Sequence, residues 1–590
     1  MNNKNIILIL LLLFTALVFF MCAGGSETTN NTGSDASVMT STGLTAEENI
    51  LEYGIPAQLL SFEYTVPDGM IEDPAKQEEM IQAKIENLEK SNDIYWGELP
   101  GEIDDLLIMF QDIWGFISSY FPGFKGLGLD WDEIGDEYYY EIEEGLESYG
   151  DFAQILTDMS FMLQEGHSLV IPGRFQGSSA SIPNLYLNKA PVIIPQNLSR
   201  IGACYTVTRD EEMVVTKVWE DSPNPYNLQI GDEIVGFNGV PWEKWIDKLL
   251  DAEIPIYGSP ASAPSAIKYN LLRSGMANIY LFEKVNIKKA DSGEIVTLPV
   301  QYLDPTKDPT RSSIITCTEL PYDTPGIDWK GEKTGEDYEY ETYTVPGETR
   351  PTIIYGKLKD TNIGYIFLLA FPSGFEEFED TALWDPYKTE FSDAFEKAVL
   401  SLMDTDGIIL DLRNNTGGRN ETAYKGFARL IDSEKEIKIF VDLERDAEST
   451  DREKLIEVDG SSHYSLMPDE GNMHYDNPIV VMTGPDCISA CDYTVAFLSK
   501  FDEFTIIGRD TNASFTGVAP MRTYEVESDY VLRYIPQLTS AYIETPTKPL
   551  LRSTGFIDEY VWFEKEYILK DSDSMRLRAV EIIENANSGE

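Results

Sequence analysis

The sequence is poor in the residues that build metal sites and disulfide scaffolds. The 590-residue chain holds only five cysteines and three histidines. No two cysteines have Cys-x-x-Cys spacing, and five are too few for a disulfide scaffold. Zinc sites need clustered Cys and His ligands, so the sequence argues against a metal site. We expect no metal and no cofactor.

Basic residues are also scarce. The chain has 45 Lys and Arg against 101 Asp and Glu, a formal net charge of -56. Phosphate binding needs a basic face, so this composition excludes nucleic acid as a partner. A well-solvated surface is the preferred explanation of the acidity, with a salt-adapted surface or a preference for basic substrates as alternatives. Hydrophobic residues reach 42%, which is enough for the three or four packed domains expected of this length.

The amino terminus has the pattern of a targeting segment. Residues 6–21 are mostly apolar and Cys22 follows at once. Sixteen residues are short for a membrane span but suit the core of a signal peptide. We therefore interpret residues 1–22 as a signal peptide or lipoprotein anchor, with an uncleaved membrane anchor as the alternative. Residues 23–50, rich in Ser, Thr, Gly and Asn, predict a flexible tether to an extracytoplasmic body.

Periodicity divides the rest of the chain. Residues 51–185 predict a helical domain in which one helix stops near Gly166, just before His167. Residues 190–300 show short β-rich runs and turn signals. Residues 301–350 are polar and predict an insertion or linker, whereas strands and helices alternate through residues 351–590. This alternation predicts a multidomain α/β protein with an α/β core.

Two strings in that core carry chemistry. GIILDLRNNTGG at residues 407–418 is an apolar strand running into a turn whose glycines let backbone N–H groups face a cavity. VVMTGPDCISACD at residues 480–492 is a strand, a turn and a helix start. Ser489 would lie at the positive end of that helix, which favours an anionic intermediate. A tight turn without catalytic role and an ordinary N-cap serine are the alternatives.

These strings, in this order, resemble the C-terminal processing peptidase and tricorn-core serine peptidase family, whose members include tail-specific proteases. The resemblance covers roughly residues 120–570, with the polar insertion unmatched. It implies a crotonase/ClpP-like spiral core with Ser489 as nucleophile. It also implies that Gly417 or Gly418, together with Ala490, supplies the backbone N–H groups of the oxyanion hole.

The β-rich part carries a second resemblance. Leu228, the run Gly231–Val235 and the pair Asn238-Gly239 resemble PDZ domains of bacterial proteases. A PDZ-like unit captures an extended peptide by adding it to a sheet edge. A generic β-hairpin is the alternative.

The general base is chosen by comparing the two branches of the family. In one branch a lysine serves, but Ser514 stands at its place and no lysine occurs between Lys500 and Lys548. In the tricorn-like branch a histidine serves, and QEGHS at residues 164–168 resembles its string. His167 is therefore the implied general base, with an ordinary pKa of ~6.5 that suits the role.

The residue that should orient this histidine departs from the family pattern. Arg552 stands where the tricorn-like branch has Glu, and a guanidinium cannot accept a hydrogen bond from imidazole. Glu544 is a nearby candidate to replace it. Loss of an orienting carboxylate costs orders of magnitude in rate. A second hypothesis therefore stays open, namely an impaired peptidase fold that binds peptides or small apolar ligands.

Two cysteines, Cys487 and Cys491, flank Ser489. They permit a disulfide if both approach closely, but two small buried residues packing behind the nucleophile are the preferred interpretation. Taken together, the sequence predicts an extracytoplasmic serine peptidase with protein or peptide substrates, and leaves its oligomeric state open.

Overall fold

The computed structural model describes the chain in several stretches separated by gaps. These are residues 66–96, 103–124, 127–146, 149–163, 165, 169–176, 179–181, 203–218, 224–252, 263–276, 278–301, 338–344, 351–358, 360–374, 377, 381–431, 437–438, 441–446, 448–457, 465–466, 474–518, 522–526, 530–535, 537–542, 555–570 and 572–588. The predicted signal or anchor segment and tether lie outside them. Among the described residues, no helix is long and apolar enough to cross a membrane.

A seven-stranded sheet forms the centre of the C-terminal part, in the strand order β23-β18-β17-β12-β11-β10-β9. Five neighbouring strands, from β11 to β23, run parallel to one another. β10 is antiparallel to β11, and β9 is antiparallel to β10. The strands are β9 (Tyr338–Tyr343), β10 (Ile353–Leu358), β11 (Ile363–Leu368), β12 (Gly407–Asp411), β17 (Ile479–Thr483), β18 (Phe504–Gly508) and β23 (Glu559–Tyr560). This core confirms the expected multidomain α/β class.

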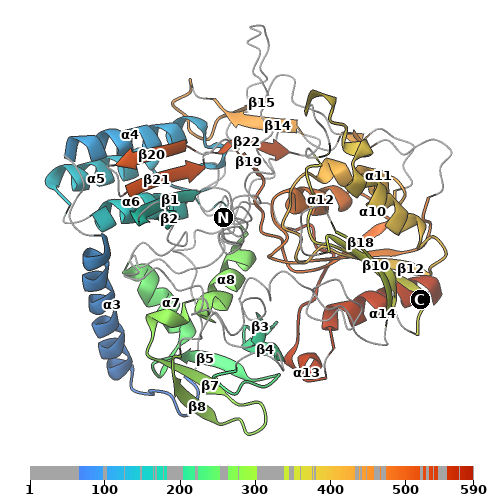
Figure 1. The fold of residues 1–590 in the computed structure, drawn as a ribbon, viewed down its shortest axis with the longest axis horizontal. Helices are drawn as coiled ribbons and strands as arrows, with labels where there is room; N and C mark the ends of the chain where they lie inside the picture. The colour runs from blue at the N-terminus through green and yellow to red at the C-terminus, as the bar shows by residue number, and fades with distance from the viewer. Residues whose placement is uncertain are drawn as a thin grey trace.

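Both faces of this sheet are covered, which explains its nearly unbroken apolar strands. Along β12, Ile409 packs with α14 on one face, while Ile408 and Leu410 pack with α10 and α12 on the other. Figure 1 shows these helices on the right-hand side of the molecule. The helices are α10 (Glu390–Leu400), α12 (Ala490–Leu498) and α14 (Ser574–Ser588), with the shorter α11 (Tyr424–Phe427) and α13 (Lys565–Ile568).

Two further units precede the core. Helices α4, α5 and α6 enclose an apolar cluster of their own, and α3 runs from them toward a second sheet, ordered β3-β4-β5-β7-β8, with β6 paired to β5 (Figure 1). The helices are α3 (Pro74–Trp96), α4 (Ile103–Tyr120), α5 (Trp131–Glu144), α6 (Tyr149–Met162), α7 (Trp242–Asp251) and α8 (Pro264–Arg273). The strands are β3 (Ala203–Val207), β4 (Met213–Val218), β5 (Glu233–Phe237), β6 (Val240–Pro241), β7 (Lys284–Lys288) and β8 (Ile295–Pro299).

Long-range strand pairing ties the helical unit to the C-terminal part. β1 pairs with β21, so Leu169 lies opposite Ile535 although 366 positions separate them. A neighbouring sheet of order β15-β14-β22-β19 extends this junction. The strands are β1 (Leu169–Gln176), β2 (Ser179–Ser181), β14 (Val441–Arg445), β15 (Leu455–Glu457), β19 (Thr516–Val518), β20 (Arg522–Val526), β21 (Tyr530–Ile535) and β22 (Gln537–Tyr542), while β13 (Ile437–Lys438) pairs with β16 (Ser465–Leu466).

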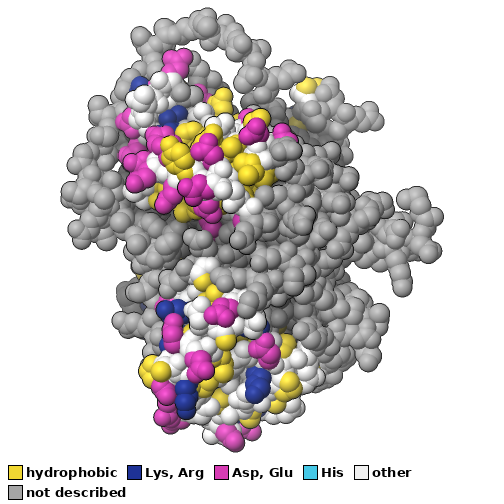
Figure 2. Space-filling view, turned by 90° about the vertical axis from the view of Figure 1, so that its left-hand side faces the viewer, with side chains coloured by type: hydrophobic (Ala, Val, Ile, Leu, Met, Phe, Trp, Pro, Cys, Tyr) yellow, Lys and Arg dark blue, Asp and Glu magenta, His cyan; other side chains and the backbone are white. Residues whose placement is uncertain are grey.

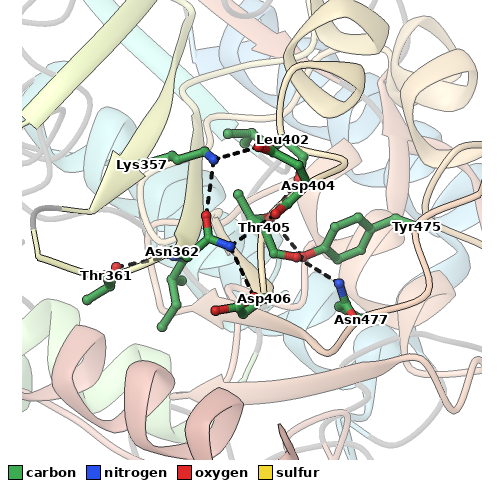
Figure 3. A network of polar contacts seen from close by, with 10 residues as sticks. Lys357, Thr361, Asn362, Leu402, Asp404, Thr405, Asp406, Tyr475 and Asn477 are labelled. Carbon is green, nitrogen blue, oxygen red and sulfur yellow. Dashed lines mark hydrogen bonds and ion pairs between the residues drawn. The ribbon is translucent and has the colours of Figure 1, made fainter.

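A polar network fastens the amino ends of the parallel strands (Figure 3). The Asn362 amide, just before β11, donates to the Asp404 carbonyl oxygen at 3.0 Å and to Asp406 Oδ1 at 3.0 Å. Lys357 Nζ donates to Asn362 Oδ1 at 3.1 Å and to Asp404 Oδ2 at 3.0 Å. These contacts connect β10, the start of β11 and the turn that enters β12.

The same network reaches β17 through the Thr405 carbonyl oxygen. The Tyr475 hydroxyl donates to it at 3.0 Å and Asn477 Nδ2 at 2.7 Å (Figure 3). The turns that enter three adjacent parallel strands are therefore cross-linked by side chains.

The surface reflects the composition. On the face drawn in Figure 2, acidic side chains are spread over the upper described patch, and Lys and Arg are few there. This distribution fits the solvated surface expected from the charge.

Candidate active site

Ser489 lies where the chain leaves β17 and enters α12, at the carboxyl end of the parallel strands. It occupies the N-cap position of α12 with φ 62° and ψ −121°. A positive φ is strained for a residue with a Cβ atom, and such strain gathers at functional sites. The sharp turn places the residue at the positive end of the helix dipole, as the sequence predicted.

A disulfide closes this turn. Cys487 and Cys491 are bonded, with their Cα atoms 5.3 Å apart, and both side chains are fully buried. The preferred prediction of two packing cysteines is therefore wrong. The reason is local, because α12 begins only at Ala490 and the chain reversal at Ser489 brings the two cysteines together.

The glycine turn after β12 lies directly against Ser489. Gly417 has φ 82°, and a Cβ on it would lie 2.8 Å from Ser489 Cβ and 2.5 Å from the Ile488 carbonyl oxygen. Only glycine fits this conformation and this approach. The two strings identified in the sequence, residues 407–418 and 480–492, are therefore in contact in the fold.

The two candidate glycines differ in where their N–H groups point. The Gly417 N–H donates to Asn415 Oδ1 at 2.9 Å, so it is already engaged. Phe371 hydrogen-bonds to the Gly417 carbonyl oxygen and the Arg419 N–H, each at 2.7 Å. In such a parallel bridge the Gly418 N–H points away from Phe371. This geometry favours Gly418 over Gly417 as the predicted oxyanion donor.

Ala490 is the first residue of α12. Its N–H belongs to the first turn, whose donors have no acceptor within the helix. It therefore suits the second donor position of an oxyanion hole.

Asn415 holds the glycine turn and the serine turn together. Its side chain is fully buried, and its Nδ2 donates to the Leu368 carbonyl oxygen at 3.1 Å. The backbone carbonyl oxygen of Asn415 accepts from the Ile488 N–H at 3.2 Å. One residue thereby joins β11, the glycine turn and the approach to Ser489.

Asp492 lies beneath the serine turn and is fully buried. Its Oδ2 accepts from the Ser489 N–H at 2.6 Å and the Ser514 N–H at 3.1 Å, and its Oδ1 accepts from the Ala513 N–H at 2.7 Å. The Thr511 hydroxyl is a fourth partner. Burial raises the pKa of this carboxyl to about 7, against the opposing effect of its four hydrogen bonds.

Ser514, at the place of the lysine of the other branch, is fully buried. Its hydroxyl donates to Asn512 Oδ1 at 2.6 Å. It therefore fixes a loop and lies in no proton-transfer arrangement among the described residues.

Helix α8, from the β3–β8 unit, contacts the turn after β17, which leads to Ser489, and the turn after β18. Arg273 makes a bidentate ion pair with Asp486, at 2.5 and 2.7 Å, three residues before Ser489. At the other end of α8, the Ser265 hydroxyl donates to Asp510 at 2.5 Å. The β3–β8 unit is thus in direct contact with the turns around Ser489.

Asp411 and Arg413, in the string GIILDLRNNTGG, form a buried network that supports the core. Arg413 is buried and pairs with Asp411 at 2.7 Å and Asp573 at 2.8 Å, and the Tyr365 hydroxyl donates to Asp411 at 2.7 Å. The network attaches the start of α14 to the end of β12 behind the glycine turn.

Three predicted residues, His167, Glu544 and Arg552, lie outside the described residues. Of the segment around His167, β1 is described from Leu169 onward, where it pairs with β21. In the described part of the chain, no group of three or more His, Cys, Asp or Glu side chains is placed to hold a metal ion.

Asn415 and Asp492 were not singled out from the sequence. For Asp492 a signal existed, because Ser489 followed three residues later by an acidic residue is the spacing of a capping box. Asn415 carried no comparable signal.

Comparison with known proteins agrees with this geometry. Residues 362–547 match the sequence profile of peptidase family S41. Over these residues, less than half of the chain, the sequence is similar to peptidase family S41. The matched residues include both the glycine turn and the Ser489 turn.

Solved structures show the wider fold. Mature CPAF is 14% identical and superposes with a TM-score of 0.53, over 82% of this chain and 98% of its own. CPAF complexed with lactacystin gives 14% identity and a TM-score of 0.52, over 82% of this chain and 99% of its own. At this identity the likeness shows the fold. No curated protein sequence matches this chain.

Proposed function

We propose that the protein is an extracytoplasmic, membrane-anchored serine endopeptidase that cleaves proteins or peptides through an acyl-enzyme at Ser489. The observation that carries the proposal is Ser489 itself, held at positive φ at the start of α12 against the Gly417 turn. A strained serine at a strand-to-helix turn with backbone N–H groups beside it is the arrangement that acyl transfer requires.

The chemistry follows from these positions. Ser489 Oγ attacks the scissile carbonyl carbon while His167 takes its proton. The N–H groups of Gly418 and Ala490 bind the oxyanion, and His167 then protonates the leaving amine. A water molecule releases the acyl group by the same route. Glu544 is the candidate to orient His167, and the PDZ-like unit would position the substrate peptide.

The test uses the full-length protein with a fluorophosphonate probe and a peptide library. We expect labelling and hydrolysis in the wild type, and loss of both by ~10⁴-fold or more in Ser489→Ala. His167→Ala should lose a comparable factor. A folded wild type that neither labels nor cleaves would exclude the endopeptidase proposal.

Arg552 supports a second candidate function. Because the residue at the orienting position cannot accept a hydrogen bond, the fold would instead serve as a binding module for peptides or small apolar ligands. Ligand binding that is unchanged in Ser489→Ala, without turnover, would favour this candidate. Arg552→Glu separates the two further, since it should raise kcat only if His167 acts as a base.

A further inference from the structure

The carboxylate of Asp492 differs from the other buried acids near the site in its partners. Asp411 faces a guanidinium and a hydroxyl. Among the described residues, Asp492 receives backbone N–H groups and one hydroxyl. No charged side chain is among these partners. A buried carboxylate without a counter-ion is costly and persists where its acceptor capacity is needed.

Those N–H groups come from two separate turns. Ser489 belongs to the turn after β17, whereas Ala513 and Ser514 belong to the turn after β18, the next parallel strand. Ser489 and Ala513 both have φ 62°, which residues with side chains rarely adopt. Hydrogen bonds to a single carboxyl group thus offset the backbone strain of two turns, which lie at the carboxyl ends of two adjacent strands.

The number of donors determines which side chain can do this. In the ionised form, which prevails above the pKa of about 7, both oxygens of the Asp492 carboxylate accept, so three N–H groups and a hydroxyl are satisfied together. An asparagine offers one oxygen and turns an NH₂ group toward the remaining donors. Asp492→Asn therefore keeps the side-chain volume but removes the capacity to accept all four hydrogen bonds.

We propose that Asp492 is a positioning residue, which acts through Ser489 by holding the serine turn against the 511–514 turn. It touches no substrate, and its effect is to fix the Ser489 backbone so that Oγ and the Ala490 N–H keep their relative placement. The proposal rests on the proposed peptidase function, because positioning matters only if Ser489 reacts.

The experiment compares full-length wild type, Asp492→Asn and a matched control, Asp573→Asn. Asp573 is also a buried acid at a helix start, accepting from the Met575 N–H at 3.0 Å and the Arg576 N–H at 3.2 Å, but it has a charged partner in Arg413 at 2.8 Å. We expect Asp492→Asn to lower kcat and the fluorophosphonate labelling rate by ~10²-fold, with KM changed less than ~3-fold. Asp573→Asn should lower the melting temperature but leave kcat within ~2-fold.

Hydrogen exchange provides a readout that does not need activity. In Asp492→Asn the amides of Ser489, Ala513 and Ser514 should exchange faster than in wild type, whereas in Asp573→Asn they should not. If exchange responds as expected while wild type shows no labelling, the endopeptidase proposal fails and the coupling of the two turns stands. Equal losses of kcat in the two variants, or unchanged exchange in Asp492→Asn, would overturn the positioning role.

Discussion

The two ends of the parallel strands are built on different principles. At the amino ends, the side chains around Asn362 and Thr405 cross-link turns, and none of the residues in that network has a positive φ. At the carboxyl ends, Gly417, Ser489 and Ala513 all have positive φ. In open α/β sheets, ligands bind beyond the carboxyl ends of the strands.

The difference shows where conformational constraint is placed. At the amino end, the residues that form the hydrogen-bonded network have ordinary backbone conformations, although Asp360, in the nearby turn between β10 and β11, has φ 59°. The carboxyl end holds unfavourable backbone conformations that are compensated by a disulfide and a buried carboxylate. Substitutions at the carboxyl end should therefore lower the reactivity of Ser489 more than their cost in stability suggests. Substitutions at the amino end should lower stability but leave the reactivity of Ser489 nearly unchanged.

The largest effect is expected from Gly417→Ala. The new Cβ meets the Ile488 carbonyl oxygen and Ser489 at a φ of 82°. We expect a loss of about 3 kcal/mol in the free energy of unfolding and of at least ~10²-fold in the labelling rate of Ser489. Denaturant unfolding and probe kinetics measure the two.

Gly293→Ala is the control for this change. Gly293 has φ 71°, but a Cβ there meets nothing within 4 Å. It should cost about 1 kcal/mol and leave labelling unchanged. Equal labelling in both variants would show that the close approach of Gly417 to Ser489 is unimportant.

The disulfide gives the next test. Replacing both Cys487 and Cys491 with alanine opens a closed loop of five residues. We expect a loss of about 2 kcal/mol in unfolding free energy, by the chain-entropy estimate, and a ~10-fold lower kcat because Ser489 lies inside the loop. Thermal unfolding and peptide hydrolysis measure these effects.

Cys204→Ala serves as the comparison, because Cys204 is also disulfide-bonded but lies in β3. It should lower stability without lowering kcat. A double variant with wild-type kcat would contradict the view that the disulfide positions the nucleophile.

The sequence predicted the core well for a physical reason. The strands around Ile409 and Val481 are buried on both faces, so their apolar runs are visible without knowledge of the fold. The placement of Gly417 beside Ser489 was implied by the family resemblance, and the structure shows its basis, since the two strings end adjacent parallel strands. The helical pattern around Ile155 was visible for the same reason as the strands, since its apolar residues face one cluster.

What the sequence could not show depends on three-dimensional contact. The bond between Cys487 and Cys491 needs the positive φ of Ser489, which no propensity indicates. The Gly417 N–H is taken by Asn415, and only the folded turn reveals that. The pairing of β1 with β21 likewise joins segments too distant for any local pattern.

The pH dependence of stability tests the carboxylate at the carboxyl end. Burial raises the pKa of Asp492 from its ordinary 3.8 to about 7, so between these values the folded chain holds a proton that the unfolded chain releases. The contribution of Asp492 to stability is therefore complete below about pH 4 and is lost as pH rises to about 7.

Titrating wild type and Asp492→Asn together isolates this contribution, because all other groups cancel in the difference. The unfolding free energy of wild type minus that of the variant should fall between pH 4 and 7 and stay constant above. In the described part of the chain, the groups facing Asp492 are three N–H donors and the Thr511 hydroxyl, none of which titrates in this range. A difference that rises with pH would contradict the raised pKa.

The smallest effect is expected at the amino end. Asn477→Ala removes one hydrogen bond to the Thr405 carbonyl oxygen, which still accepts from the Tyr475 hydroxyl at 3.0 Å. Because the acceptor keeps a partner, the loss should be near ~1 kcal/mol of unfolding free energy. Labelling of Ser489 should stay within ~2-fold of wild type, since the network lies at the opposite end of the strands. A large fall in labelling here, at so small a cost in stability, would mean that the two ends are coupled through β12 and β17 and that the division between them does not hold.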